Sequence, residues 1–279
     1  MVWIIGGILV ILLFLVFCSG HLWRQYQSEA VKGVELTGRQ GTSVITQEDL
    51  AHLPGPIQKY LRYVGVLGKE KVHNYLVKFD GGMKADRTRD WMKVQVQQYS
   101  FTDITTRLFF MTAKMFGLPV IGLHAYKGST ARMKIKIAGL IPVVNGEGEK
   151  MNQSETVTVF NDMCLLAPAT LIDKRIQWEL IDDYTVKAKF RNQAYTITAT
   201  LYFNEEGQLT NFVSDDRFLS ETGKTFESYR WSTPISDYQN INGYMLPTYG
   251  EAVWSLPEGD FSYIRFRIKN VEYNVKDFR

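Results

Sequence analysis

Cysteine is scarce in this chain, which contains only Cys18 and Cys164 among 279 residues. Two cysteines exclude a disulfide-stapled scaffold and a cysteine-rich zinc site. Histidine is almost as sparse, and no two histidines have the HxH or HExxH spacing of zinc and iron sites. We therefore expect no metal site and no cofactor. The four histidines are His21, His52, His73 and His124.

An excess of charge of either sign is also missing. Lys and Arg together number 32 and Asp and Glu 29, which gives a net charge of +3, and the chain contains no basic block. A protein that binds nucleic acid by neutralising phosphates needs a concentrated basic surface. The composition therefore excludes that class, and it also lacks the features of collagen-like and low-complexity chains.

The motifs of common catalytic sites do not occur. There is no Gly-x-Ser-x-Gly elbow, and Gly146–Lys150 lacks the spacing of a phosphate-binding loop and predicts a turn. Cys164 lies in an apolar stretch, where a thiol is inert. The pairs Asp182-Asp183 and Asp215-Asp216 fall between strand patterns and are predicted to be solvated turn residues. We predict no catalytic residue, with an enzyme site around His124 and a carboxylate as the alternative.

A long apolar run stands at the start of the sequence. Residues 2–18 read VWIIGGILVILLFLVFC, and the first charged side chain is Arg24. A helix of about 20 such residues spans the roughly 30 Å hydrocarbon core of a bilayer, and Trp3 and Trp23 lie where interfacial aromatics belong. We predict an uncleaved single-pass anchor over residues 1–23. A cleaved signal peptide is the alternative.

Helix signals beyond the anchor are few. Thr46 and Asp49 have the form of a capping box at the start of a helix. An apolar stripe that begins after a proline and ends before Gly65 predicts a short amphipathic helix over Pro56–Val64. Ser154–Leu166 fits either a helix capped by Ser154 or a strand.

The rest of the chain has the two-residue period of β-strands. We predict a polar tether over residues 24–45 and a single β-rich domain over residues 46–279. Short turns between clean alternating runs favour an antiparallel meander. The expected fold is mainly β (α+β), a curved antiparallel sheet or incomplete barrel with a few short helices. A change of phase near Asn270 predicts a bulge. The clearest alternating runs are 132–137, 186–191, 196–203 and 263–269.

One face of these strands is apolar and is the candidate ligand-binding surface. Phe, Tyr and Trp together contribute 37 rings, from 16, 15 and 6 residues. Such a content suits either a well-filled β core or a surface for an apolar ligand. The candidate ligand-binding residues are Met133, Ile135, Ile137, Ile197, Leu201, Phe203, Ile264 and Phe266.

Two segments near the C-terminus resemble periplasmic lipoprotein-carrier (LolA-like) domains. Ile235–Thr248 reads ISDYQNINGYMLPT, a strand with an Asn-Gly hairpin, and Ile268–Asn274 ends in NVEYN. The resemblance implies an incomplete antiparallel barrel whose helices plug an apolar concave face that holds acyl chains. It covers about 40 residues.

A wider resemblance, over residues 46–275, is to a bacterial family of unknown function. It rests on Leu53–Val66, Leu140–Val144, Trp178–Asp183 and Tyr202–Gly207. That family implies no catalytic residues.

Together these features predict a membrane-anchored module of the cell envelope that binds a lipid or another apolar ligand. The expected partners are the membrane and that ligand, and not nucleic acid. A structural or interaction domain with a self-filled core is the main alternative. The basic residues Arg24, Lys32 and Arg39 after the apolar run favour a cytoplasmic domain. The carrier resemblance favours the other side of the membrane, and we expect an extracytoplasmic domain.

Overall fold

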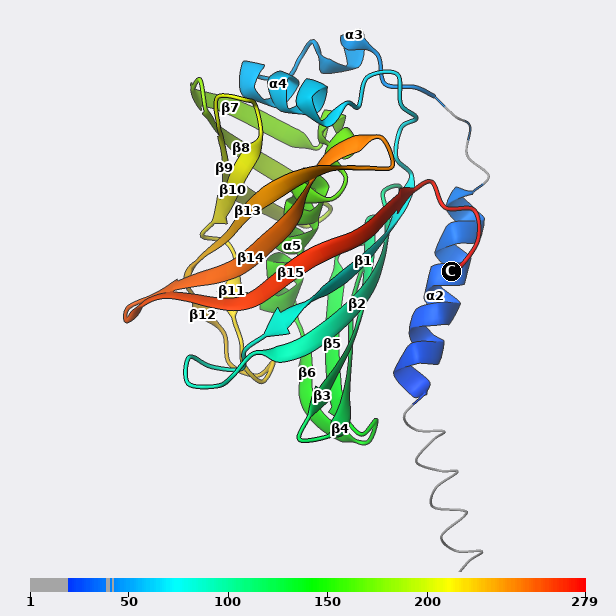
Figure 1. Ribbon diagram of the computed structural model, residues 1–279, viewed down its shortest axis with the longest axis vertical. Coiled ribbons are helices and arrows are strands. Elements are labelled where there is room, and N and C mark those ends of the chain that lie inside the picture. The colour runs from blue at the N-terminus through cyan, green and yellow to red at the C-terminus, as the bar shows by residue number, and fades with distance from the viewer. Residues whose placement is uncertain (1–19, 39–40, 42) are drawn as a thin grey trace, which may run out of the picture.

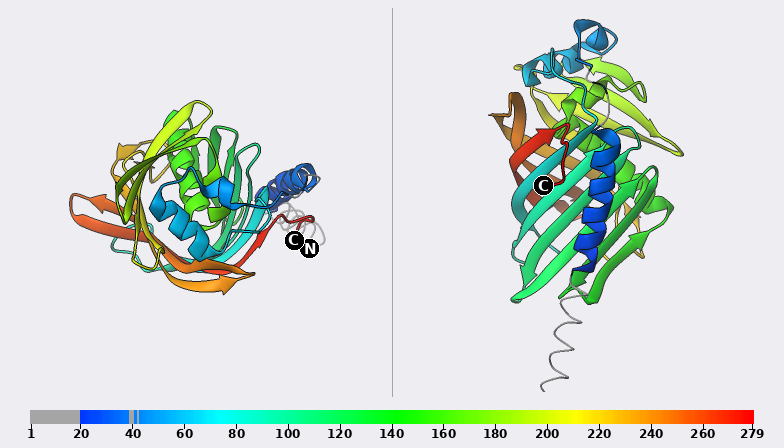
Figure 2. Two further views of the ribbon diagram at one scale, coloured as in Figure 1. Left: turned by 90° about the horizontal axis from the view of Figure 1, so that it is seen from above. Right: turned by 90° about the vertical axis from the view of Figure 1, so that its right-hand side faces the viewer.

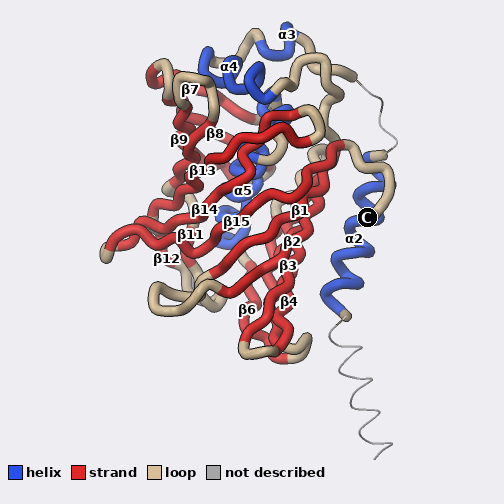
Figure 3. Tube along the Cα trace, in the orientation of Figure 1, coloured by secondary structure: helices blue, strands red, loops and turns tan. Residues whose placement is uncertain are grey.

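The computed structural model describes residues 20–38, 41 and 43–279. Most of the described chain is strand, and helices occur inside the sheet, above it and on its outer face (Figure 3). The predicted anchor falls mainly on residues 1–19, which lie outside the described residues. Of the helices in the described part, none has both the length and the apolar character needed to cross a membrane.

Thirteen strands form one antiparallel sheet in the order β6-β5-β4-β3-β2-β1-β15-β14-β13-β10-β9-β8-β7 (Figure 1). All but two of its neighbouring pairs, β1 with β15 and β10 with β13, are consecutive in sequence, which confirms the predicted antiparallel meander. A small ribbon of β11 (Phe218–Leu219) and β12 (Glu227–Ser228) stands apart. The strands of the large sheet are β1 Asn74–Met83, β2 Met92–Phe101, β3 Thr106–Met115, β4 Leu118–Lys127, β5 Thr130–Ile137, β6 Ile141–Glu147, β7 Ile176–Asp182, β8 Thr185–Asn192, β9 Tyr195–Phe203, β10 Leu209–Ser214, β13 Arg230–Ile241, β14 Tyr244–Leu256 and β15 Gly259–Tyr273.

The four clearest alternating runs lie within β5, β8, β9 and β15, as predicted. The phase change near the end of β15 has the predicted cause. On β1, Lys78 pairs with Asn270 and the next residue, Phe79, pairs with Ile268, so that Lys269 is left without an opposite residue. This bulge moves later residues of β15 to the other face of the sheet.

The sheet curves around α5 (Glu149–Leu165), which lies inside the ring of strands when the molecule is seen from above (Figure 2). Ser154–Leu166 is therefore helical, but Ser154 is not its cap. The helix begins after Gly148, whose φ of 104° turns the chain out of β6. The Ser154 hydroxyl, inside the helix, donates to the Lys150 carbonyl at 2.8 Å.

The predicted tether is wrong, because α2 (His21–Thr37) occupies much of it and packs on the outer face of the sheet (Figures 1 and 2). The buried residues Leu22, Tyr26, Ala30 and Val34 recur every fourth position and form one helical stripe. A Cβ on Gly33 would lie 2.3 Å from the Phe101 ring, so glycine permits this close approach. The apolar residues of the sheet in the same cluster are Leu76, Tyr99, Phe101, Leu108, Phe110 and Leu123.

Two short helices lie above one end of the barrel. Thr46 and Asp49 form the predicted capping box at α3 (Gln47–Leu50). The predicted second helix is α4 (Gly55–Val64), which ends at the left-handed Gly65 with φ 82°. The Tyr60 hydroxyl on α4 donates to the Cys164 carbonyl of α5 at 2.8 Å, so this helix closes the barrel over the filled half of the core.

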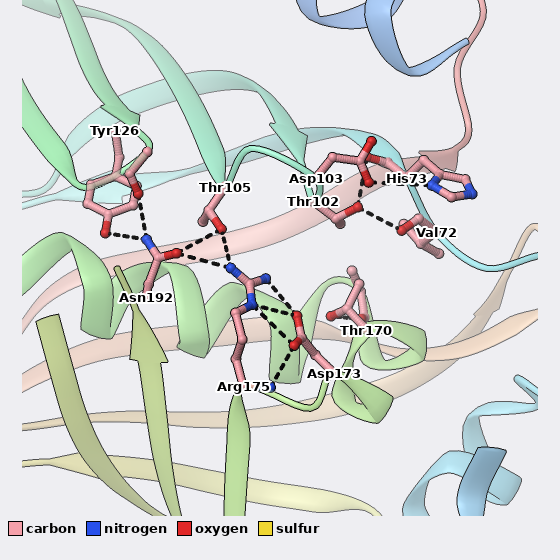
Figure 4. Close-up of polar contacts among 12 residues, drawn as sticks. Val72, His73, Thr102, Asp103, Thr105, Tyr126, Thr170, Asp173, Arg175 and Asn192 are labelled. Atoms are coloured by element: carbon pink, nitrogen blue, oxygen red, sulfur yellow. Dashed lines mark hydrogen bonds and ion pairs between the residues drawn. The ribbon is translucent and has the colours of Figure 1, made fainter. Parts of the chain in front are cut away.

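Side chains also link strands that are not neighbours in the sheet (Figure 4). Asn192 at the end of β8 donates to the Tyr126 hydroxyl of β4 at 2.7 Å and to the Gly128 carbonyl at 2.6 Å. Arg175, in the loop between the 3₁₀ helix η1 (Pro168–Ile172) and β7, donates to Thr105 at 2.7 Å and to Asn192 at 3.0 Å. These contacts hold β4 beside β8, although the two strands are not neighbours in the sheet.

Candidate functional site

A cavity of about 1050 Å³ lies between α5 and the concave face of the sheet. Strands β1–β5 and β13–β15 supply most of its walls, and α5 supplies the opposite side. Ligand pockets commonly measure about 300–1,000 Å³ and are mostly apolar. The cavity is therefore large enough for a ligand of drug or acyl-chain size.

The alternation of β5 shows how the sequence builds this wall. Met133, Ile135 and Ile137 point into the cavity, while Arg132, between Ala131 and Met133, is exposed on the outer face. From Ile264 to Ile268 on β15, the same two-residue period places apolar residues inside and arginines outside. Strand period and sheet curvature together produce an apolar concave surface.

The structure divides the eight candidate residues between two places. Five border the cavity, namely Met133, Ile135, Ile137, Ile264 and Phe266. The other three belong to the filled half of the core and do not border the cavity: Ile197 and Leu201 are 0% exposed and Phe203 7%. Phe203 packs against Tyr60 of α4, with ring centroids 5.7 Å apart.

Sequence reasoning missed most of the methionines of the cavity, since Met133 is the one methionine among the eight candidates. Six of the nine methionines border the cavity, and they come from β1, β2, β3, β5 and α5. Methionine is unbranched and polarisable, so a wall rich in it adapts to ligands of different shape. The residues are Met83, Met92, Met111, Met115, Met133 and Met151.

A buried ion-pair cluster forms the polar part of the cavity. The Arg107 guanidinium on β3 donates from Nε to Oδ2 of Asp162 at 2.7 Å and from Nη1 to Oε2 of Glu155 at 3.3 Å. Gln98 also donates to Asp162, at 2.8 Å. Burial raises the pKa of Asp162, although Arg107 and Gln98 oppose this change. Each of these three buried charges thus has a neighbour of opposite sign, which reduces the cost of its burial.

His124 on β4 faces the same carboxylate from the other side. Its Nε2 lies 3.3 Å from Oε1 of Glu155, without hydrogen-bond geometry. Burial, with the charges of Arg107 and Arg217, lowers the pKa of His124 to about 4, so the imidazole is neutral at pH 7. Burial disfavours the charged form of Glu155, but its basic neighbours and a hydrogen bond from Thr158 hold its pKa below the usual value. A carboxylate therefore lies next to His124, as the alternative prediction of an enzyme site required.

Arg217 reaches the cavity from the loop between β10 and β11. Its guanidinium carbon lies 4.5 Å from the centroid of Trp231 and 5.2 Å from that of Trp254. Nε donates to the Thr158 hydroxyl at 3.3 Å, and Nη1 donates to the Tyr263 hydroxyl at 3.2 Å. The cation therefore sits among aromatic rings and hydroxyls.

The polar residues on α5 carry a signal that sequence reasoning missed. Glu155, Thr158 and Asp162 stand at positions i, i+3 and i+7, which share one helical face. Arg107 and Arg217 are isolated in the sequence and only the fold brings them to that face. Within residues 20–38, 41 and 43–279 no three His, Cys, Asp or Glu side chains gather into a metal site.

The other residues that the sequence analysis considered for catalysis have structural roles. Cys164 is buried, and burial raises the pKa of its thiol. Asp216 accepts hydrogen bonds from the Thr198 amide at 2.6 Å and hydroxyl at 2.8 Å, and Asp215 pairs with Arg230. Asp182 accepts from the Tyr184 amide in the turn after β7.

Solvent reaches the cavity at the end of the barrel opposite α4. The exposed residues on its border come from the loop after β1, from β6, from the loop after β11 and from the turn between β14 and β15. Examples of these residues are Arg87, Val143, Glu221 and Glu258. The cavity is thus closed at one end and open at the other.

Solved structures that are similar to the chain include the following three. A DUF1329 family protein from Desulfovibrio piger has a TM-score of 0.44 and 11% identity, covering 79% of this chain and 92% of its own. A LolA superfamily protein from Nitrosomonas europaea has a TM-score of 0.40 and 12% identity, and the match covers 83% of this chain and 94% of that protein. A putative outer membrane lipoprotein-sorting protein domain from Vibrio parahaemolyticus has a TM-score of 0.41 and 9% identity, and the match covers 88% of this chain and 93% of that domain.

The comparison with curated proteins gives no match. The model of one protein family, described as a family of unknown function, matches residues 43–266. This range agrees with the residues 46–275 over which the sequence resembles such a family. The chain belongs to that family, DUF6544.

Proposed function

We propose that the protein is a membrane-anchored module that binds an acyl chain, or another apolar ligand of similar size, in the cavity beside α5. The observation that supports this most strongly is the unfilled cavity of about 1050 Å³ with an apolar wall. Apolar surface left in contact with water costs roughly 25 cal/mol per Å², and a ligand that covers it recovers this free energy.

The alternative of a self-filled core describes only half of the barrel. Around Phe160, the rings of Phe190 and Phe212 lie 5.2 and 5.7 Å away, and the interior there is packed. Between α5 and β15, the half-buried Ile264 and Phe266 instead face the cavity. Two different interiors in one barrel favour a binding function for the open half.

Exposed apolar residues at the open end support a contact with the membrane. Phe116 and Leu118, in and beside the turn after β3, are 90% and 50% exposed. Ile141 and Val143 of β6 are 60% and 48% exposed, and the Ala138 amide beside them donates to the Pro119 carbonyl. We name these four residues the apolar rim. Clustered apolar side chains on a surface are typical of membrane or protein contacts.

The charge around the apolar rim suits an anionic bilayer. No Asp or Glu occurs from residue 104 to residue 146, while Lys and Arg occur six times. Basic residues next to inserted apolar groups attract anionic headgroups. The first turn of α2, which follows the apolar run at residues 2–18, lies at this end of the barrel (Figures 1 and 2). We propose that the open end of the cavity faces the bilayer.

Photo-crosslinking of the full chain in phosphatidylcholine nanodiscs tests the binding function. Palmitic acid with a diazirine on its acyl chain should label peptides of β5 and β15. Ile135→Asp, which places a charge on the apolar wall of the cavity, should strongly reduce the labelling, whereas Lys134→Asp on the outer face of the same strand should not. Equal labelling of both variants, or labelling of other peptides only, would contradict the proposal.

Fluorescence quenching tests the contact of the apolar rim with the bilayer. In a Cys18→Ser background, a bimane label on Phe116→Cys should be quenched by lipids brominated near the headgroup. Ile104 precedes β3 at its other end and is 60% exposed, so the label on Ile104→Cys serves as the control. Equal quenching of the two labels would exclude this orientation.

A further inference from the structure

The guanidinium of Arg217 has more donors than partners. It carries five N–H groups, and its hydrogen bonds to Thr158 and Tyr263 use two of them. Among the residues that the structure describes, no carboxylate lies within 4.0 Å of it as an ion-pair partner. Three N–H groups are therefore left for a ligand that enters the cavity.

Tyr263 adds a further donor at the same point. Its hydroxyl oxygen accepts from Nη1 of Arg217 and from Nε1 of Trp231, both at 3.2 Å. These two bonds use both lone pairs of the oxygen, so the hydroxyl hydrogen is directed elsewhere. Tyr263 borders the cavity, and donors from two side chains therefore meet where an acceptor could bind.

Arg107, which is buried whereas Arg217 is half-buried, shows the contrast. It is paired with Glu155 at 3.3 Å and with Asp162 at 2.7 Å. Glu155 faces Arg217 across Thr158, but its oxygens already interact with Arg107, with the Thr158 hydroxyl and with His124. The carboxylates of α5 are thus engaged by Arg107 and its neighbours, and neither of them is an ion-pair partner of Arg217.

We propose that Arg217 and Tyr263 bind the singly charged anionic headgroup of the apolar ligand, a carboxylate or a phosphodiester. This inference rests on the proposed function of the cavity and names the chemical class of its ligand. Trp231 and Trp254 support it, because stacked rings hold a planar guanidinium in place without consuming its donors. A monoanion suits the site better than a dianion, because the charges of Arg107, Arg217, Glu155 and Asp162 sum to zero and each further negative charge is costly in a partly buried site.

The test compares photoactivatable palmitic acid with its methyl ester on the full chain in phosphatidylcholine nanodiscs. Arg217→Gln should raise the concentration of the acid at half-maximal labelling about 10- to 100-fold, the usual effect of losing hydrogen bonds to a charged group. Tyr263→Phe should raise it several-fold. Labelling by the ester should change little in both variants, which also shows that the variants fold.

Arg267→Gln is the matched control. Arg267 lies on the same strand as Tyr263 and also stacks on an aromatic ring, that of Tyr249, at 4.8 Å, but it faces outward and pairs with Asp237. Its loss should leave labelling by the acid unchanged.

A second probe, a photoactivatable lysophosphatidylglycerol, distinguishes the two sources of the anion. If only the labelling by the acid depends on Arg217, the headgroup is a carboxylate. If only the labelling by the lysolipid depends on Arg217, the headgroup is a phosphodiester. Dependence for both means that the site recognises any monoanionic headgroup. If neither probe depends on Arg217 while the ester still labels the cavity, the headgroup site is wrong and the binding function stands. If no probe labels the cavity, the proposed function itself fails.

Discussion

Protonation of His124 should destabilise the fold as the pH falls. Burial lowers its pKa from 6.5 to about 4. The unfolded chain therefore binds more protons than the folded chain between these two pH values, and stability rises with pH there. The contribution of His124 is complete above pH 6.5 and is lost as the pH falls toward 4. A pKa difference of this size corresponds to about 3 kcal/mol.

The assay is urea unfolding of the full chain in mild detergent, followed by tryptophan fluorescence at several pH values between 7 and 4. Other groups titrate in this range, so the informative quantity is the difference between wild type and His124→Gln. The free energy of unfolding of wild type should fall by about 3 kcal/mol more than that of the variant. His52→Gln is the control, because His52 is exposed. A variant with the same pH dependence as wild type would refute the buried neutral imidazole.

Three further predictions follow from the packing and the topology. Leu201→Ala should cost about 2–5 kcal/mol of unfolding free energy, because Leu201 is fully buried. Ile135→Ala beside the cavity should cost roughly 1–2 kcal/mol. Equal losses of unfolding free energy in urea would show that the two interiors do not differ. Asn192→Ala should cost about 1–3 kcal/mol and speed hydrogen exchange in β4 and β8, because it removes the hydrogen bonds of Asn192 with the Tyr126 hydroxyl and with Arg175. The same change at the exposed Asn145 should alter neither quantity. Alkaline phosphatase fused after Arg279 should be active, since we expect the domain outside the cytoplasm; an inactive fusion together with an active cytoplasmic reporter would reverse that expectation.

The strands and their antiparallel order could be predicted because alternation is a local signal. β5, β8, β9 and β15 each carry it, and the bulge near Asn270 was visible as a change of phase. The capping box at Thr46 and the glycine at the end of α4 are equally local. Each of these features depends on residues within one turn or one strand, which is the range over which sequence patterns are informative.

α2 was missed because its apolar stripe is thin. Leu22, Tyr26, Ala30 and Val34 give only one apolar side chain per turn, amid a polar sequence. Such a stripe predicts a helix only if a partner surface is known. Here that surface is the outer face of β2–β4, whose strands are apolar on both sides.

The sequence also could not predict which residues of the apolar face are buried in the filled half and which face the cavity. Leu201 and Ile135 have the same kind of alternating neighbours, yet Leu201 is fully buried on a strand packed against α5 while Ile135 faces the cavity. Which strand lies under the helices depends on the path of α5 through the barrel. The meeting of Arg107, Glu155 and Arg217 depends on the same path, because these residues are up to 110 positions apart.

The central claim is that the cavity beside α5 holds an apolar ligand, and anomalous diffraction tests it most directly. Crystals of the full chain grown with palmitic acid brominated along its acyl chain should show bromine peaks inside the cavity, between β5 and β15. The carboxylate should lie within hydrogen-bond distance of Arg217. A cavity that holds no bromine and is closed by the inward collapse of its methionine side chains would contradict the account.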